Sequence, residues 1–328
     1  MSLDRANRSF LAFVGIALLA GAIVFCGAVG AVLLPLIFAP RSQWFVSSAL
    51  AVVFMAPLAV GVGLGIRSLG RQALASYRLT RRVRRLAAAA PDDLKRAATH
   101  TGLAGRIVVV DAAEAFSFVY GVFTPRVAVS RSLCDSASPG ELRAVLEHER
   151  YHVCNLDPLK MFLLRVLSAT LFYLPVLGSL RARYVAGREL AADRRAVVIC
   201  GRRSLAGALL KVVRGPDWSE LHMAASLGGR ELLDARVVQL ETGREPKLAA
   251  PSLSRVAASF LVAVILAAAY VASVSSFGLT AVYHLTGAAL AEATIRGGLS
   301  CGAPFAGAGL VLYMLIAMRA TRSLNAGL

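Results

Sequence analysis

The sequence predicts a mainly α-helical membrane protein, with four transmembrane helices, one further membrane-embedded segment and a cytoplasmic α+β domain. Three observations lead to this fold class. Hydrophobic residues make up 57% of the 328 residues and the mean hydropathy is +0.65, which is too apolar for an ordinary soluble domain. Long uncharged runs lie towards both ends of the chain. The segment between them is charged and contains β-branched runs that are typical of strands.

The charge balance is strongly basic, with 36 Lys and Arg against 19 Asp and Glu and a net charge of +17. In a soluble protein this balance would favour nucleic-acid binding. The interleaved basic and aromatic residues of single-strand binders are missing, however, so we expect no direct nucleic-acid contact. Basic loops beside anionic lipid explain the charge better, and the lipid bilayer is the expected partner. The five cysteines are odd in number and form no C-x-x-C, which favours a reducing compartment.

Two transmembrane helices are predicted within residues 1–66. Residues 10–38 carry no charge, and at about 1.5 Å per residue a helix of this length crosses ~30 Å of hydrocarbon. Residues 44–66 form the second helix, with Trp44 as an interfacial anchor. Seven arginines follow it, namely Arg67, Arg71, Arg78, Arg81, Arg82, Arg84 and Arg85. By the positive-inside rule this side of the membrane is cytoplasmic, and so is the N-terminus.

Residues 67–250 are predicted to form the cytoplasmic domain. A short helix is expected over residues 92–101, and β-branched runs predict strands over 106–111 and 126–133. Between them, "AFSFVYGVF" at residues 115–123 is either a further strand or a loop on the rim of a cleft. Helices and strands together make this domain α+β.

A longer helix is predicted to begin at "SPGE", residues 138–141. Ser138 can cap the helix, Pro139 suits its first turn, and Glu141 can complete a capping box. The helix should run to about Asn155, because Pro158 disfavours helix at the residue before it.

The C-terminal part, residues 251–328, is predicted to contain two more transmembrane helices. Residues 256–279 form one apolar span and residues 304–318 a shorter one. Arg319 and Arg322 follow the last span on what should be the cytoplasmic side. The outer loop between the two spans is too short for a folded domain.

The predicted long helix carries "HERYH", an H-E-x-x-H pattern formed by His148, Glu149 and His152. Side chains four residues apart on a helix point the same way, so both imidazoles can reach one Zn²⁺ at about 2.0–2.1 Å. Glu149 projects beside that face and can take a proton from a metal-activated water without binding the metal. The pattern therefore predicts a catalytic zinc site. The alternative is a pair of surface histidines on an amphipathic helix.

A catalytic zinc site needs a third protein ligand, and "GRELAADRRAV" offers one. Glu189 is the candidate ligand. Asp193, one turn later, could hydrogen-bond the far nitrogen of a ligand histidine and fix its tautomer. The alternative stays open that both acids form salt bridges on a solvated face, with Arg188, Arg194 and Arg195.

A shared metal also constrains residues 161–180, which are apolar but contain Arg165 and Pro175. His148 and Glu189 must lie on one side of the membrane, so a single crossing between them is excluded. Two full crossings do not fit in about twenty residues. The segment therefore enters the membrane and returns, or packs under the domain; we favour the membrane-embedded form. The chain then crosses the cell membrane four times, with both termini and the active site in the cytoplasm.

Several segments together are similar to one known family. They are "SFVYGVFTPRVAVSRSL", "SPGELRAVLEHERYH", "DPL", "RELAAD" and "LLDARVVQL", and they lie between about residues 105 and 240. The chain resembles the BlaR/MecR-type family of integral membrane zinc metalloproteases, which belong to the gluzincin group. The resemblance implies that His148, His152 and Glu189 hold zinc. It also implies that Glu149 is the catalytic base and that Asp193 is the acid behind the ligands.

The resemblance implies a zinc endopeptidase that cleaves a protein at the cytoplasmic face. The substrate would be a transcriptional regulator, such as a winged-helix repressor, or damaged membrane protein. The penicillin-binding sensor domain of the best-known members is not expected here, because the sequence stops soon after the last predicted span. Two alternatives remain: an HtpX-like quality-control protease, and a metal-free membrane signalling scaffold.

Three further features stay open. His222 is a candidate oxyanion stabiliser, because peptide hydrolysis needs a hydrogen-bond donor at the developing charge. Residues 116–129 are the candidate sheet edge for binding the substrate as an added strand. A homodimer is an open alternative for the oligomeric state.

Overall fold

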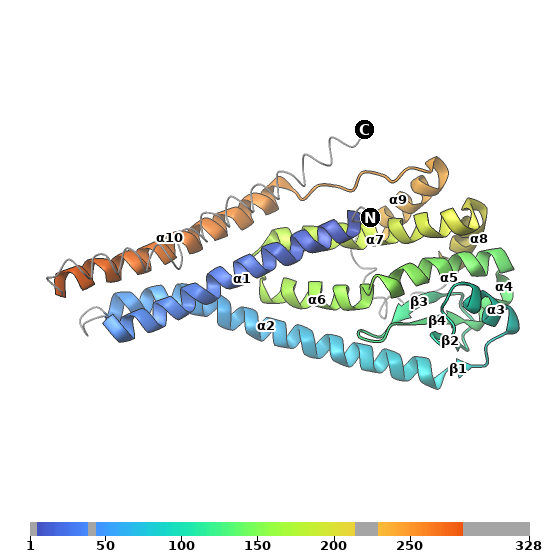
Figure 1. The fold of residues 1–328 in the computed structure, drawn as a ribbon, viewed down its shortest axis with the longest axis horizontal. Helices are drawn as coiled ribbons and strands as arrows, with labels where there is room; N and C mark the ends of the chain where they lie inside the picture. The colour runs from blue at the N-terminus through green and yellow to red at the C-terminus, as the bar shows by residue number, and fades with distance from the viewer. Residues whose placement is uncertain (1–4, 39–43, 214–228, 285–328) are drawn as a thin grey trace. The chain divides into compact units, whose positions relative to one another are not determined.

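The computed structural model describes residues 5–38, 44–213 and 229–284, and the described chain is mainly helical (Figure 1). It divides into two compact units. The mixed unit comprises Met1–Phe10, Ser68–Arg165 and Arg181–Ala249. The apolar unit comprises Leu11–Arg67, Val166–Leu180 and Ala250–Leu328. The division into residues 1–66, 67–250 and 251–328 stays a prediction.

Long apolar helices make up most of the apolar unit. Helix α1 spans Arg5–Phe38 and helix α2 spans Trp44–Arg85, so the arginines after the second predicted span continue the same helix. Within the described residues, Arg5–Ala28 and Val52–Arg85 are long and apolar enough to cross a membrane by length and composition. Membrane association is therefore supported, and the number of crossings is not fixed by this finding.

The third predicted span coincides with helix α10, Leu253–His284. Its described side chains pack in the apolar unit, where Leu266 joins Val24 of α1 and the fully buried Phe54 of α2. The fourth predicted span, residues 304–318, lies outside the described residues.

The segment predicted to return forms a helical hairpin. Helix α6, Asp157–Thr170, is followed by a short turn, and helix α7, Pro175–Cys200, begins at the proline singled out in the sequence. Ser259 of α10 accepts a hydrogen bond from the Val176 backbone N–H at 3.0 Å, which fixes the start of α7. Helix α6 rises only about 21 Å at 1.5 Å per residue. This rise is shorter than the ~30 Å of hydrocarbon in a bilayer, and the membrane-embedded position of residues 161–180 stays a prediction.

The sheet of the mixed unit has four strands in the order β1-β2-β4-β3. They are β1 (Ala87–Ala88), β2 (Ile107–Val110), β3 (Ser117–Tyr120) and β4 (Arg126–Ser130). Strand β4 pairs with β2 in parallel and with β3 antiparallel. The stretch left open between strand and loop thus contains β3, which lies at an edge of the described sheet.

Helix α5, Pro139–Cys154, lies along one face of this sheet (Figure 1). The predicted capping box is present, since Ser138 and Glu141 exchange side-chain-to-backbone hydrogen bonds. Apolar side chains of α5, such as Leu142 and Leu146, pack with Val129 of β4 in the core. The surrounding helices are α3 (Asp92–His100), α4 (Arg131–Ser136), α8 (Arg202–Val213) and α9 (Gly229–Thr242).

The approach of α6 to α2 generates a stability prediction. A Cβ on Gly61 would overlap the carbonyl oxygen of Thr170, whereas a Cβ on Gly63 would meet open space. We expect Gly61→Ala to destabilise the folded protein by about 1–3 kcal/mol, as overpacking does in other tightly packed contacts. Gly63→Ala is the matched control and should leave the Tm unchanged or slightly raised. Thermal unfolding of the detergent-solubilised protein checks both, and equal Tm values for the two variants would contradict the prediction.

Candidate metal centre

Helix α5 brings His148 and His152 to one face, as their spacing predicts. Their Nε2 atoms lie 3.1 Å apart, and both residues are buried. Directly after α5, Leu156 adopts a positive φ of 54°, which turns the chain sharply so that α6 starts at Asp157. The two imidazoles and the start of α6 are therefore held together by local backbone geometry.

Helix α7 supplies Glu189 to the same point. Its Oε2 lies 3.5 Å from Nε2 of His148 and its Oε1 lies 3.7 Å from Nε2 of His152. Tetrahedral zinc with ligands at about 2.0–2.2 Å separates its ligand atoms by about 3.3–3.6 Å. The three atoms, all within 4.8 Å of one another, therefore fit a zinc ion.

A carboxylate stands behind each imidazole. Asp193 Oδ1 lies 2.9 Å from Nδ1 of His148, and Asp157 Oδ2 lies 2.5 Å from Nδ1 of His152. A carboxylate on Nδ1 keeps the proton on that nitrogen, which leaves the Nε2 lone pair free for a metal. Asp193 was expected in this position. Asp157 was not, although its place five residues after His152, just past the helix end, was a usable signal.

Arg236 of α9 holds Asp193 in place. Its Nε donates to Asp193 Oδ2 at 2.6 Å and its Nη2 donates to Oδ1 at 2.8 Å. Gln239, one turn later, donates to the backbone oxygen of Leu190 at 2.8 Å and thereby docks α9 on α7. Arg236 was not among the predicted site residues. A lone arginine inside the run "LLDARVVQL" was its only signal.

The structure does not show the alternative of salt bridges on a solvated face, because Arg188 pairs with Glu189 but their side chains are only 13% and 15% exposed. Arg188 Nε lies 3.2 Å from Glu189 Oε1, whereas Arg194 pairs with Glu245 and Arg195 lies 3.5 Å from Glu147. Asp193 is completely buried, so it does not belong to a solvated face. Its burial is balanced by Arg236 and His148, which hold the pKa of its carboxyl below the ordinary value.

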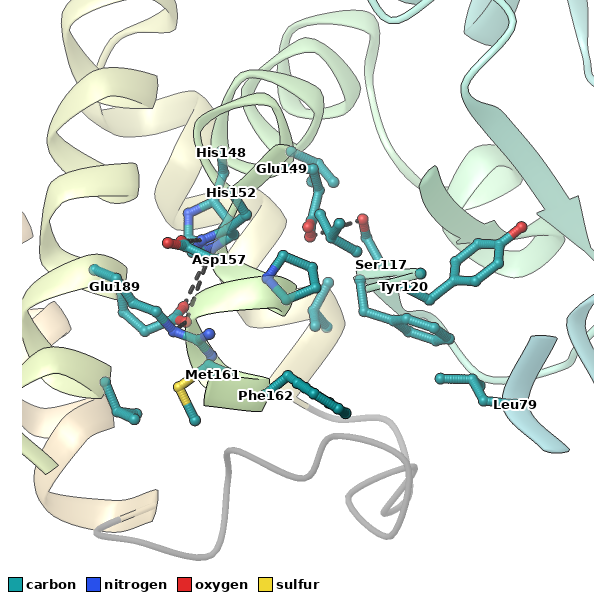
Figure 2. Close-up of a pocket in the computed structure, with 18 of the residues that line it drawn as sticks. Leu79, Ser117, Tyr120, His148, Glu149, His152, Asp157, Met161, Phe162 and Glu189 are labelled. Carbon is teal, nitrogen blue, oxygen red and sulfur yellow. Dashed lines mark hydrogen bonds and ion pairs between the residues drawn. The ribbon is translucent and has the colours of Figure 1, made fainter. Parts of the chain in front are cut away.

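Glu149 lies next to the three converging atoms without being one of them. Ser117 of strand β3 donates its hydroxyl to Glu149 Oε1 at 2.9 Å. Figure 2 shows Glu149 turned towards Ser117, while Glu189 lies with the histidines. The arrangement leaves a carboxylate available for proton transfer at the end of the edge strand.

These side chains line a cavity of about 410 Å³ within the mixed unit. Tyr120, Met161 and Phe162 provide apolar surface on the same cavity (Figure 2). It combines an apolar wall with a few convergent polar groups, as is typical of ligand sites. His222 lies outside the described residues, so its role as an oxyanion stabiliser stays a prediction.

The charges around His148 favour a proton where a metal would bind. Burial disfavours a charged His148, but the interactions with Asp193 and Glu189 outweigh it and raise the pKa of His148 to about 10. Burial likewise opposes the charge on Glu189, but His152 and His148 keep the pKa of Glu189 well below its ordinary value. Cation binding in this site therefore competes with a proton on His148.

Comparison with known proteins agrees with this geometry. A family model described as BlaR1 peptidase M56 matches residues 40–240, about three fifths of the chain. The matched range includes the three converging residues, Glu149 and both carboxylates behind the imidazoles. No curated protein matches the sequence.

Asp157→Asn should weaken zinc binding by about 10- to 100-fold, because His152 loses the carboxylate that holds its tautomer. Chelator competition with the purified protein measures the Kd. Asp92→Asn is a matched control, since Asp92 is exposed and forms its salt bridge with Lys95 on α3. An unchanged Kd for Asp157→Asn would show that the contact does not position the ligand.

Zinc affinity should rise with pH. The raised pKa of His148 means that the metal-free imidazole is protonated below about pH 10, so zinc binding must release that proton. The Kd should therefore fall by up to about tenfold per pH unit between about pH 6.5 and 8.5. Asp193→Asn removes the main interaction that raises the pKa and should flatten this dependence. A pH-independent Kd for the unmodified protein would contradict the prediction.

Proposed function

The chain belongs to the BlaR1 peptidase M56 family, and we propose that it is a membrane-embedded zinc endopeptidase that cleaves a protein substrate at the cytoplasmic face. One observation carries the proposal. Within the described residues, three candidate metal-binding atoms from α5 and α7 converge, and the carboxylate of Glu149 lies beside them without joining them. That arrangement supports hydrolysis rather than a structural metal site, because structural zinc sites use four protein ligands.

His148, His152 and Glu189 would hold the zinc, and the imidazoles would be oriented by Asp193 and Asp157. When bound, zinc supplies Lewis acidity that makes water a nucleophile at neutral pH and polarises a peptide carbonyl. The remaining chemistry belongs to side chains of this chain.

Glu149 is the proposed general base and acid. It would accept the proton of the attacking water and pass it to the leaving amine, as general acid–base catalysis requires. The hydroxyl of Ser117 donates to one oxygen of its carboxylate, so the other oxygen is left for the proton. Ser117 is therefore proposed as a positioning residue for Glu149.

Strand β3 is the proposed binding edge for the substrate. It lies at an edge of the described sheet and pairs on one side with β4. Edge strands offer unpaired backbone groups to which an extended peptide can add as a further strand. Ser117 is the first residue of β3 and contacts Glu149, so a peptide lying on this edge would pass the general base.

The proposed setting is the cell membrane, with four crossings and with both termini and the active site in the cytoplasm. Two apolar helices and the family support membrane association. The arginines at the end of α2 favour a cytoplasmic position for the mixed unit. The proposed substrate is a cytoplasmic transcriptional regulator, such as a winged-helix repressor. A substrate trap made with Glu149→Gln would identify it.

Glu149→Gln should abolish proteolysis while zinc binding is retained. Loss of general acid–base catalysis typically costs about 10²- to 10⁴-fold in rate, and Glu149 is not one of the three ligands. Cleavage of trapped substrate and zinc content per chain measure the two effects separately.

The control is the His148→Ala, His152→Ala double variant, which should lose both zinc and activity. Two outcomes would contradict the proposal. One is proteolysis by Glu149→Gln at the rate of the unmodified protein. The other is an equal zinc content in the unmodified protein and the double variant.

A further inference from the structure

The beginning of helix α1 belongs to the mixed unit, although the rest of that helix belongs to the apolar unit. The residues from Arg5 to Phe10 lie with the metal centre, and the helix continues without a break to Phe38. The proposed reaction gives this short stretch no role, yet its polar side chain Asn7 is linked to the metal centre by hydrogen bonds.

Asn7 bonds directly to the junction between α5 and α6. Its Nδ2 donates to Asn155 Oδ1 at 3.1 Å. Lys160 Nζ donates to Asn7 Oδ1 and to Asn155 Oδ1, both at 2.7 Å. An ammonium group has only donors, so it fixes which end of each amide is the oxygen.

The fixed amide of Asn155 is connected through Asp157 to the candidate ligand His152. With its oxygen held by Lys160 and Asn7, its Nδ2 faces Asp157 and donates to Asp157 Oδ1 at 2.5 Å. The other oxygen of Asp157 lies 2.5 Å from Nδ1 of His152. The side chains of Asn7, Asn155 and Asp157 therefore connect helix α1 to Nδ1 of His152.

A second connection runs through aromatic side chains. The Phe10 ring packs against Tyr184 with 5.7 Å between ring centroids, and Tyr184 is completely buried. Its hydroxyl donates to Asp157 Oδ1 at 2.5 Å. Ala6 packs against Gly187, where a Cβ would lie 3.3 Å from the Ala6 Cα. The start of α1 thus contacts both α7, which carries Glu189, and the α5–α6 junction, which carries Asp157.

We propose that Asn7 and Phe10, in the first turns of α1, are positioning residues for the metal centre, acting through Asn155 and Tyr184 on Asp157. The affinity of the site for zinc then depends on where α1 docks. Because Asn7 shares one continuous helix with the apolar run to Phe38, an axial shift of that helix changes the support of His152. This proposal rests on metal binding by the site but not on its peptidase activity.

Asn7→Asp tests the proposal in the full-length protein. It keeps the shape of the side chain but replaces the donor to Asn155 with an acceptor. The Asn155 oxygen, which Lys160 still holds, then faces a carboxylate oxygen, so the two acceptors repel each other and the Asn155 amide is displaced from Asp157. The expected result is a zinc Kd about 3- to 10-fold weaker, below the effect of partners that touch a ligand directly. The visible spectrum of the Co²⁺-substituted protein should change as His152 is displaced.

Ser9→Ala is the matched control, because the Ser9 hydroxyl donates only to the Arg5 carbonyl oxygen within α1. It should leave both the zinc Kd and the Co²⁺ spectrum unchanged. Phe10→Leu tests the aromatic connection independently and should weaken zinc binding in the same direction.

A double-mutant cycle separates positioning from general destabilisation. If Asn7 acts through Asp157, adding Asn7→Asp to Asp157→Asn should weaken zinc binding no further. An additive loss would overturn the proposal, and so would an unchanged Kd in both Asn7→Asp and Phe10→Leu. Both readouts are measured without a substrate. A protein that binds zinc normally but cleaves nothing would refute the peptidase function while leaving this test valid.

Discussion

The pairing of each imidazole with a buried carboxylate is the interaction on which the metal centre depends. His148 and His152 can offer a lone pair to a cation only while their other nitrogen keeps its proton. Asp193 and Asp157 supply that restraint from two different helices. The site is therefore assembled by the meeting of α5, α6 and α7 rather than by the histidine pair alone.

Burying two carboxylates is costly unless each is paired and fully hydrogen-bonded. The bidentate hydrogen bonds from Arg236 offset the cost of burying Asp193. Because Arg236 lies on α9, this helix must dock on α7. Among the described residues, no arginine forms a hydrogen bond with Asp157, which instead receives hydrogen bonds from Tyr184 and Asn155 and lies in the field of Arg188. The two halves of the site thus differ: Asp193 is hydrogen-bonded by a guanidinium group, and Asp157 by a phenol and an amide.

The sequence predicted what depends on local spacing. The helix start at Ser138 and the shared face of the histidine pair follow from capping chemistry and helical periodicity, and Glu189 follows from the need of a catalytic zinc for a third ligand. Asp157 and Arg236 were missed, because their roles depend on where the chain turns and where a distant helix docks. Strand β3 stayed ambiguous, since its four residues are too few for periodicity to separate a strand from a loop.

Leu156 links the geometry of the metal centre to the flexibility of the chain. A leucine with φ of 54° costs roughly 1–2 kcal/mol relative to the ordinary helical region. Glycine would remove that penalty, but it would also let the link between two helices sample many more conformations. Leucine at position 156 keeps this conformational cost, but it narrows the range of angles between helices α5 and α6. Ligands that must converge on one metal ion from neighbouring helices would gain more from that narrowness than from a relaxed peptide.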